Sequence, residues 1–446
     1  MTTQAAARIG AHTDPSDVLD SLGKHILVDG FHLVLDLERS SGSWMVDAAS
    51  GKRYLDFYTM FASLPIGHNH PALADPDFIG YLGRVASSKP ANSDIYTSAY
   101  ADFVETFARV LGDAALPHLF FVEGGGLAVE NALKVAFDWK SRKNEAAGRS
   151  ADLGMKAMHL TKAFHGRTGY TMSLTNTDPI KTARFPQFDW PRIETPAIIH
   201  PIADNLAAVE SAERLALGQA RARFEAAPHD IACFIAEPIQ GEGGDIHLRS
   251  EFLLAMQELC HEYDALFILD EVQTGLGTGT AWAYQQLGLA PDVVAFAKKV
   301  QLGGIMAGRR VDDIPDNVFK VSSRINSTWG GGLVDMVRSQ RILETIEQER
   351  LFERSRTTGD RLHSGLQQLS ADFAQVTNVR GRGLMCAFDM PDGGERGALI
   401  EALRVAQVIA LSCGDRSVRL RPALSVTNDE IDTGLSRIRA ALTSMG

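Results

Sequence analysis

Short apolar runs alternate with stretches of helical periodicity through the middle of this 446-residue chain. The runs predict buried strands of a mostly parallel sheet, because they are nearly continuous in apolar residues, at 119–122, 157–160, 231–236, 266–269 and 293–296. Between them, apolar residues recurring every three or four positions predict helices at 100–111, 127–140 and 250–263. Strands that alternate with helices in this way are typical of an α/β fold.

The pattern is less regular elsewhere. Residues up to about Pro15 are expected to be frayed, and 43–57 to form short strands around a turn. We interpret 275–279 as a mobile active-site loop, 303–308 as a glycine-bounded apolar turn, and 218–229 as a polar helix and loop. A long charged helical stretch begins at 333, and strands and helices then alternate over 384–388, 397–406, 408–411, 418–421 and from about 428.

These boundaries predict three parts. Residues 1–65 form an N-terminal segment that packs with the small domain. Residues 66–332 form a large cofactor-binding domain with a mostly parallel sheet, and residues 333–446 form a smaller α/β domain.

Composition and charge restrict the class of protein. Hydrophobic residues make up 45% and charged residues 22%, which is ordinary for a globular protein. The net charge of −11 argues against nucleic acid or an anionic membrane as a partner. No stretch is long and apolar enough to span a bilayer, and the N-terminus has no apolar signal core. Four widely spaced cysteines are typical of reduced thiols, so we expect a cytoplasmic protein.

Two predicted strands that are consecutive along the chain are followed by side chains of complementary chemistry. Asp270 follows the run at 266–269, and Lys298 and Lys299 follow the run at 293–296. Ligands bind at the carboxyl ends of strands in open α/β sheets. An amine that forms a Schiff base and a carboxylate that holds a proton on the pyridine nitrogen are what pyridoxal phosphate requires. The alternative is an aspartate that caps a turn and an ordinary surface lysine pair.

A second motif suits the phosphate group of such a cofactor. The strand at 119–122 runs into Gly124, Gly125 and Gly126 and then into a helix. Backbone N–H groups at a helix N-terminus favour an anion, and glycines let it approach closely. The alternative is a tight turn without a ligand.

Further candidates lie in three other loops. Phe164, His165 and Arg167 can supply a ring stack, a polar contact and a carboxylate clamp, although an aromatic residue alone is more often core. Glu237 and Glu242 flank glycines after the strand at 231–236. The loop at 326–332 offers the side chains of Asn326 and Thr328.

Arg419 and Arg421 lie two apart on one short strand and so face the same side. They are either a carboxylate-binding pair or an exposed basic edge strand. Metal is not expected, because His68 and His70 have no acid or cysteine partner at ligand spacing.

Together these motifs resemble the subgroup-III aminotransferases of the aspartate-aminotransferase fold, over nearly the whole chain. The resemblance rests on 270–275 with Lys299 downstream. Further segments make the resemblance strongest to those members that transfer the ε-amino group of L-lysine. These segments are 123–130, 137–140, 164–167, 237–244 and 326–329. It implies a pyridoxal-phosphate-dependent transferase of fold type I, with a large domain and a smaller α/β domain.

The resemblance also implies individual roles. Lys299, rather than Lys298, would carry the cofactor and shuttle the proton, and Asp270 would pair with the ring nitrogen. The remaining cofactor-binding residues would be Gly125, Gly126, Phe164, His165, Glu237 and Gln273, with Thr328 reaching the phosphate of the neighbouring subunit in a homodimer with shared sites. The substrate-binding residues would be Arg167, Glu242, Asn326, Arg419 and Arg421.

The implied reaction transfers the ε-amino group of L-lysine to 2-oxoglutarate, giving L-2-aminoadipate 6-semialdehyde, which cyclises to piperideine-6-carboxylate, and L-glutamate. Glu242 would pair with an arginine, Arg419 first and Arg421 second, and swing away for the acidic substrate. The alternatives are an ornithine or 4-aminobutyrate aminotransferase and a non-catalytic protein of this fold that binds pyridoxal phosphate or has a regulatory role. Gly124 and Gly332 depart from the family pattern of a hydroxyl residue and an asparagine, respectively, which bears on cofactor affinity.

Overall fold

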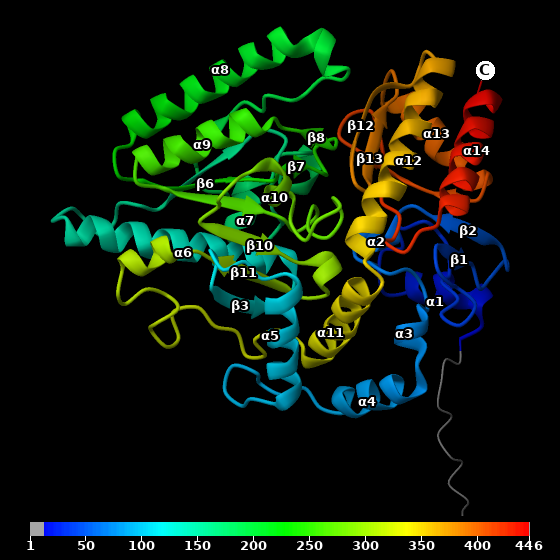
Figure 1. Ribbon diagram of the computed structural model, residues 1–446, viewed down its shortest axis with the longest axis horizontal. Coiled ribbons are helices and arrows are strands. Elements are labelled where there is room, and N and C mark those ends of the chain that lie inside the picture. The colour runs from blue at the N-terminus through cyan, green and yellow to red at the C-terminus, as the bar shows by residue number, and fades with distance from the viewer. Residues whose placement is uncertain (1–12, 446) are drawn as a thin grey trace, which may run out of the picture.

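The computed structural model describes residues 13–445, which form two lobes lying side by side (Figure 1). The large lobe contains a seven-stranded sheet in the order β3-β11-β10-β9-β6-β4-β5. β10, β9, β6, β4 and β5 pair in parallel, and β11 runs antiparallel to both of its neighbours. The strands are β3 (His118–Val122), β4 (Lys156–Leu160), β5 (Arg192–Ile193), β6 (Ile231–Ala236), β9 (Leu266–Asp270), β10 (Val293–Phe296) and β11 (Gly303–Ala307). The expected α/β class is confirmed.

The sheet is buried on both faces, which explains the continuous apolar runs. Phe267 and Leu269 of β9 pack on one face with helices α5 (Ser98–Val110) and α9 (Ser250–Glu262). Leu266 and Ile268 point to the opposite face and pack with α6 (Gly125–Ala146). Successive side chains of a strand point to opposite faces, so a strand covered on both sides needs apolar residues at every position.

The small lobe contains two further sheets. One is antiparallel, in the order β12 (Thr377–Arg382), β13 (Met385–Asp389), β16 (Ser417–Leu420), β15 (Leu411–Cys413). The other joins the N-terminal strands β1 (Trp44–Val46) and β2 (Arg53–Asp56) to β14 (Val408–Ile409) near the C-terminus. This lobe also holds helices α12 (Leu351–Asp372), α13 (Gly393–Val405) and α14 (Asn428–Ser444).

Three sequence expectations need correction. The apolar segment from 303 is a strand, β11, whose glycines allow close backbone approach: a Cβ on Gly303 would lie 2.3 Å from the Gly124 carbonyl oxygen. The helix expected at 218–229 is the end of the longer α8 (Ile202–Ala226). The helical stretch from 333 is two helices, α11 (Leu333–Gln348) and α12, separated at Arg350, whose φ is 53°.

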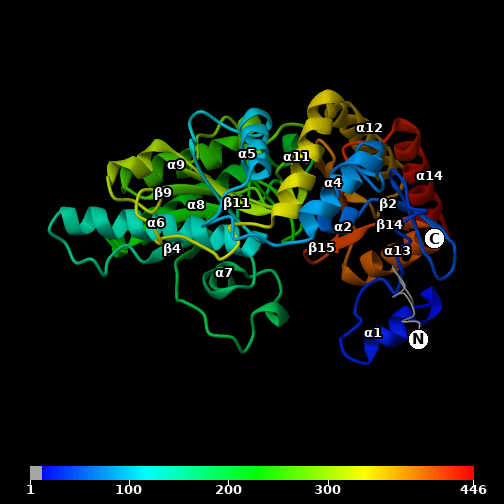
Figure 2. The same ribbon diagram turned by 90° about the horizontal axis from the view of Figure 1, so that it is seen from below.

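The remaining elements are short and mostly peripheral. Seen from below, the segment that follows α7 forms a loop projecting from the large lobe (Figure 2). No helix within residues 13–445 is long and apolar enough to cross a membrane. The shorter elements are α1 (Val18–Gly23), α2 (Thr59–Ala62), α3 (Pro71–Ala74), α4 (Pro76–Ala86), α7 (Gly169–Leu174), α10 (Ala283–Leu287), β7 (Ile239–Gln240), β8 (Ile246–His247) and the 3-10 turns η1 (Pro15–Asp17), η2 (Pro179–Lys181), η3 (Lys298–Val300) and η4 (Arg309–Asp313).

Candidate active site

Parallel strands bring the predicted residues to one edge of the large sheet. β9 ends in Asp270, and its neighbour β10 is followed by Lys298 and Lys299. A cavity of about 490 Å³ opens at this edge. Its lining includes seven of the predicted residues, Gly125, Gly126, Phe164, His165, Glu237, Asp270 and Gln273.

Asp270 is held rigidly in this cavity. Its Oδ2 lies 2.7 Å from His165 Nδ1, and its Oδ1 accepts a 3.0 Å hydrogen bond from the Val272 backbone N–H. Both side chains are buried. A buried carboxylate with fixed partners presents negative charge at one defined place, which suits the pairing of a protonated ring nitrogen.

The two adjacent lysines occupy different positions. Lys298 lines the cavity, has a φ of 51°, and donates from Nζ to the Phe61 carbonyl oxygen at 3.2 Å. Lys299 is 4% exposed, and its Nζ lies 3.0 Å from where a Cβ on Gly277 would sit. Burial first, and then the charge of Arg421, lower the pKa of Lys299 to about 7. A lowered pKa makes the neutral, nucleophilic amine available near neutral pH.

The loop that contacts Lys299 is buried rather than exposed. Gly275 to Gly279 has buried residues throughout, and the Gly277 carbonyl accepts a hydrogen bond from the Leu384 N–H of the small lobe. The interpretation of this segment as a mobile loop is therefore wrong, because the small lobe packs over it.

The glycine loop has the shape of an anion cradle. Gly124 has a φ of 92°, a conformation that glycine adopts without strain, and α6 starts at Gly125. A Cβ on Gly125 would lie 2.8 Å from Val272 Cγ1, so a larger residue would fill the space. The loop therefore leaves backbone N–H groups of a 22-residue helix bare at the cavity.

Glu237 orders the loops around the cavity. Its carboxylate accepts hydrogen bonds from the backbone N–H groups of Phe164 at 2.9 Å and Gly241 at 3.1 Å. Burial, and then the neighbouring Asp270, raise the pKa of Glu237 well above its usual value. Glu237 thus joins the aromatic residue that lines the cavity to the loop that carries Glu242.

Glu242 contacts two cations, each of which approaches a residue that lines the cavity, Phe164 or Gln273. Its Oε2 lies 2.9 Å from Arg419 Nη2, and its Oε1 lies 2.5 Å from Lys181 Nζ. Burial alone would raise the pKa of Glu242, but Arg419 and Lys181 together lower it. Arg419, the first choice from the sequence, is therefore the arginine that contacts Glu242.

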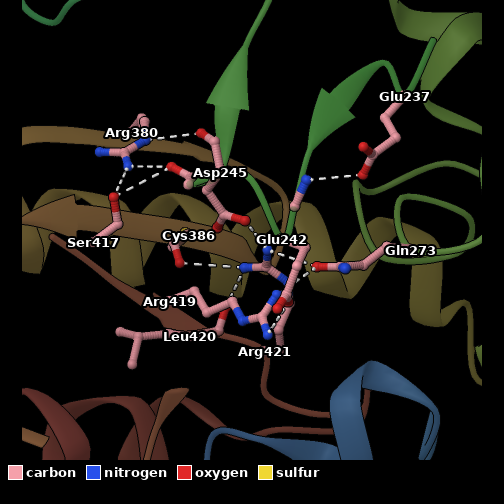
Figure 3. Close-up of polar contacts among 12 residues, drawn as sticks. Glu237, Glu242, Asp245, Gln273, Arg380, Cys386, Ser417, Arg419, Leu420 and Arg421 are labelled. Atoms are coloured by element: carbon pink, nitrogen blue, oxygen red, sulfur yellow. Dashed lines mark hydrogen bonds and ion pairs between the residues drawn. The ribbon is translucent and has the colours of Figure 1, made fainter. Parts of the chain in front are cut away.

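Arg421 has a different partner. It forms a buried ion pair with Asp245 and also donates to Gln273 Oε1 at 3.2 Å, as Figure 3 shows. Arg419 approaches the same Gln273 oxygen, so the two arginines do face one side. The alternative of an exposed basic edge strand is wrong, because β16 lies between β13 and β15 and both arginines are buried.

Three predicted residues lie outside this cluster. Arg167, Asn326 and Thr328 are exposed in the single chain. Like the buried or half-buried Lys299, Glu242, Arg419 and Arg421, they are not among the residues that line the cavity. His68 Nε2 pairs with Asp56 at 2.9 Å. No group of three or more His, Cys, Asp or Glu side chains among residues 13–445 is arranged to hold a metal ion.

The comparisons with known proteins agree with this geometry. The family model of class-III aminotransferases matches residues 28–442. The chain belongs to that family. Members use pyridoxal phosphate, and the chain is a pyridoxal-phosphate-dependent aminotransferase of fold type I, as the sequence resemblance implied. A purely regulatory protein is therefore not supported.

Relatives of nearly 60% identity are described as lysine aminotransferases. The chain is 59% identical over 442 residues to the L-lysine-epsilon aminotransferase of Mycobacterium tuberculosis, covering 98% of both chains. A solved structure titled lysine aminotransferase from M. tuberculosis in the internal aldimine form superposes with a TM-score of 0.96 at 59% identity, covering 97% of this chain and 100% of that one. A probable 4-aminobutyrate aminotransferase of Caenorhabditis elegans is more distant, at 32% identity over 90% of this chain and 86% of its own length.

The residues present fit the family cofactor. The donor set combines bare helix N–H groups, a fixed carboxylate and a buried lysine, which suit phosphate, ring nitrogen and aldehyde respectively. Sequence reasoning missed Lys181 and Arg380, which contact the loop of Glu242, and Asp245, which lies in that loop. No local pattern marks them, because their partners are 61, 176 and 135 residues away in sequence.

Proposed function

We propose that this chain transfers the ε-amino group of L-lysine to 2-oxoglutarate, giving L-2-aminoadipate 6-semialdehyde and L-glutamate. The observation that carries the proposal is the 59% identity, over 98% of both chains, to a protein named L-lysine-epsilon aminotransferase. The pairing of Glu242 with Arg419 adds support, because it gives the site a way to accept a neutral chain end and an acidic substrate in turn.

The two substrates make different demands on the site. The reacting end of L-lysine is an amine on an apolar stem, and a free arginine beside it would be an unpaired buried charge. L-Glutamate places a carboxylate next to its reacting carbon, and that carboxylate needs an arginine. We propose that Glu242 neutralises Arg419 for the first substrate and releases it for the second.

We assign the cofactor contacts as follows. Pyridoxal phosphate, when bound, accepts the amino group from one substrate and passes it to the other. Lys299 would attach the cofactor and move the substrate proton, and Asp270, oriented by His165, would keep the ring nitrogen protonated. The other contacts would come from Gly125 and Gly126 to the phosphate, Phe164 to the ring face, and Gln273 to the phenolic oxygen. Arg167 and Asn326 would contact the distal part of the substrate.

We also propose a cytoplasmic homodimer with shared sites. The loop of Thr328 contacts the segment at 92–93 through the Ser93 hydroxyl, which donates to the Thr328 carbonyl oxygen at 3.2 Å. Exposed apolar side chains occur in this loop, with Trp329 at 41%, and just after that segment, with Ile95 at 68% and Tyr96 at 74% exposure. Such a patch is typical of a protein interface. The four cysteines are free thiols, in agreement with a reducing compartment. Light scattering that gives a monomer mass for the loaded enzyme would contradict the dimer.

Amine-donor profiling tests the proposed reaction. The enzyme loaded with pyridoxal phosphate is assayed with L-lysine, L-ornithine and 4-aminobutyrate at a fixed concentration of 2-oxoglutarate, and L-glutamate is measured. An aldehyde trap detects the cyclised product. L-Lysine is expected to give the highest kcat/KM. A higher value with either competing donor would reject lysine as the substrate while leaving the chemistry of the family intact.

A further inference from the structure

Glu242 lies between cations that come from different lobes. Arg419 lies in the strand β16 of the small lobe, and Lys181 ends the 3-10 turn η2 of the large lobe. Each cation binds its own oxygen of the carboxylate, at 2.9 Å for Arg419 and 2.5 Å for Lys181. The carboxylate can therefore lose one partner without losing the other.

The backbone beneath Glu242 is fixed. Its carbonyl oxygen accepts a 3.0 Å hydrogen bond from the Gly414 N–H, and a Cβ on Gly243 would lie 2.1 Å from the Lys162 carbonyl oxygen. Three residues after Glu242, Asp245 is held through its side chain by Arg421 and through its carbonyl oxygen by Arg380 Nε at 2.8 Å (Figure 3). Any rearrangement of Glu242 must therefore come from rotation of its side chain.

Lys181 has contacts that do not depend on Glu242. Its Nζ lies 5.3 Å from the centre of the Phe164 ring, within the range of a cation–π interaction, and it donates to Thr177 Oγ1 at 3.3 Å. Its side chain is only 16% exposed. The ammonium group is thus in place whether Glu242 contacts Arg419 or not.

We propose that Lys181 is a positioning residue that retains the Glu242 carboxylate while Arg419 is released to bind the carboxylate of an acidic substrate. The inference rests on the proposed function and deepens it. With both cations present, Glu242 has two partners in the paired state and one in the released state, and without Lys181 it has one and none. A sole partner stabilises a half-buried carboxylate more than a second partner does, because a carboxylate without any partner bears the whole cost of desolvation. Removal of Lys181 therefore shifts the balance toward the Arg419 pair, and the acidic substrate competes less well.

The test measures the two half-reactions separately in Lys181→Met, a variant that keeps the length of the side chain and removes its charge. The loaded enzyme is mixed with L-lysine or with L-glutamate, and the cofactor absorbance is followed through a single turnover. The rate with L-glutamate is expected to fall about tenfold, which corresponds to about 1.4 kcal/mol. The rate with L-lysine should change less than about twofold, because the Arg419 pair persists.

Two further variants separate this role from a structural one. Lys181→Arg should restore the L-glutamate rate, since it keeps the positive charge. Lys156→Met is the matched control, because it removes a lysine that pairs with Asp230 at 2.9 Å and is 40% exposed, and neither rate should change. An equal loss in both half-reactions for Lys181→Met, or no loss in either, would overturn the inference.

A double variant tests whether Lys181 acts through Glu242. In a Glu242→Ala background the carboxylate is gone, so adding Lys181→Met should leave the L-glutamate rate unchanged. A further fall would mean that Lys181 binds the acidic substrate directly, contrary to the inference. If the wild-type enzyme does not react with L-lysine at all, the proposed function fails. The L-glutamate measurements still decide the role of Lys181, so the two failures are distinguishable.

Discussion

His165 Nδ1 and Asp270 Oδ2 lie 2.7 Å apart in a cavity at the carboxyl edge of the sheet, although the two residues are 105 positions apart in sequence. The imidazole leaves the carboxylate one defined orientation, with its second oxygen bound by the Val272 N–H. The charge of Asp270 is thereby fixed where a ring nitrogen has to be kept protonated.

Replacement of Asp270 by asparagine should abolish most of the turnover and leave the fold intact. The amide can keep a hydrogen bond to His165 but carries no charge. Removing one partner of a buried charge pair costs about 2–5 kcal/mol, or about 30- to 3,000-fold in kcat. Glu271→Gln is the matched control, because that buried carboxylate binds the Tyr284 N–H instead, at 2.9 Å, and its variant should stay within a few-fold of wild type. Equal losses in both would contradict the role of Asp270.

The choice between the adjacent lysines can be tested directly. Lys299→Ala should lose covalent attachment of pyridoxal phosphate, whereas Lys298→Ala should retain it, because the Lys298 ammonium binds the Phe61 carbonyl oxygen. Borohydride reduction followed by peptide mass spectrometry identifies the labelled residue. A label on Lys298 in the wild-type enzyme would reverse the assignment.

Attachment of the cofactor should depend on pH in a way that reports the environment of Lys299. Burial lowers the pKa of Lys299 to about 7, compared with about 10.4 for a free lysine. The neutral amine reacts, so the attachment rate of the apoenzyme should rise with pH, reach half of its maximum near pH 7 and then level off. Stopped-flow absorbance measures this rate. A rate that is still rising near pH 10 would show an unperturbed amine.

Glu242→Ala should damage the half-reaction with L-lysine far more than that with L-glutamate. The substitution leaves Arg419, which is 4% exposed, without its carboxylate when the bound substrate end carries none. The penalty of about 2–5 kcal/mol predicts a fall of about 30- to 3,000-fold in the L-lysine rate. Single-turnover absorbance separates the halves. Equal losses in both would argue against the exchange of partners.

Asp245→Ala should lower stability, because it leaves Arg421 buried at 3% exposure without a counter-charge. Breaking a buried pair costs about 3–5 kcal/mol. Asp432→Ala serves as the comparison, since it removes an exposed partner of Arg361 and should cost less than about 1 kcal/mol. Urea denaturation gives both free energies of unfolding. Similar values for the two variants would show that the Asp245 pair is not a stabilising contact between the lobes.

The sequence by itself determined five of the seven strands of the large sheet and much of the cavity. Strands such as β9 are buried on both faces, so their apolar runs are continuous and can be recognised. Asp270 could be identified because it ends such a strand, and Gly125 because it begins the helix that follows one. β11 was missed because it begins with two glycines, which have low strand propensity. Gly303 is needed there for its close contact with Gly124, and a local sequence pattern does not reveal a contact with a distant segment.

Only the tertiary structure decided which charges meet. The sequence predicted that Arg419 and Arg421 face the same side of one strand. In the folded chain Arg419 pairs with Glu242, and Arg421 pairs with Asp245. Lys181 carried no signal in the sequence, because an isolated lysine in a loop resembles any solvated lysine. Its significance arises from a carboxylate 61 residues away, and such pairings depend on how loops from separate strands converge.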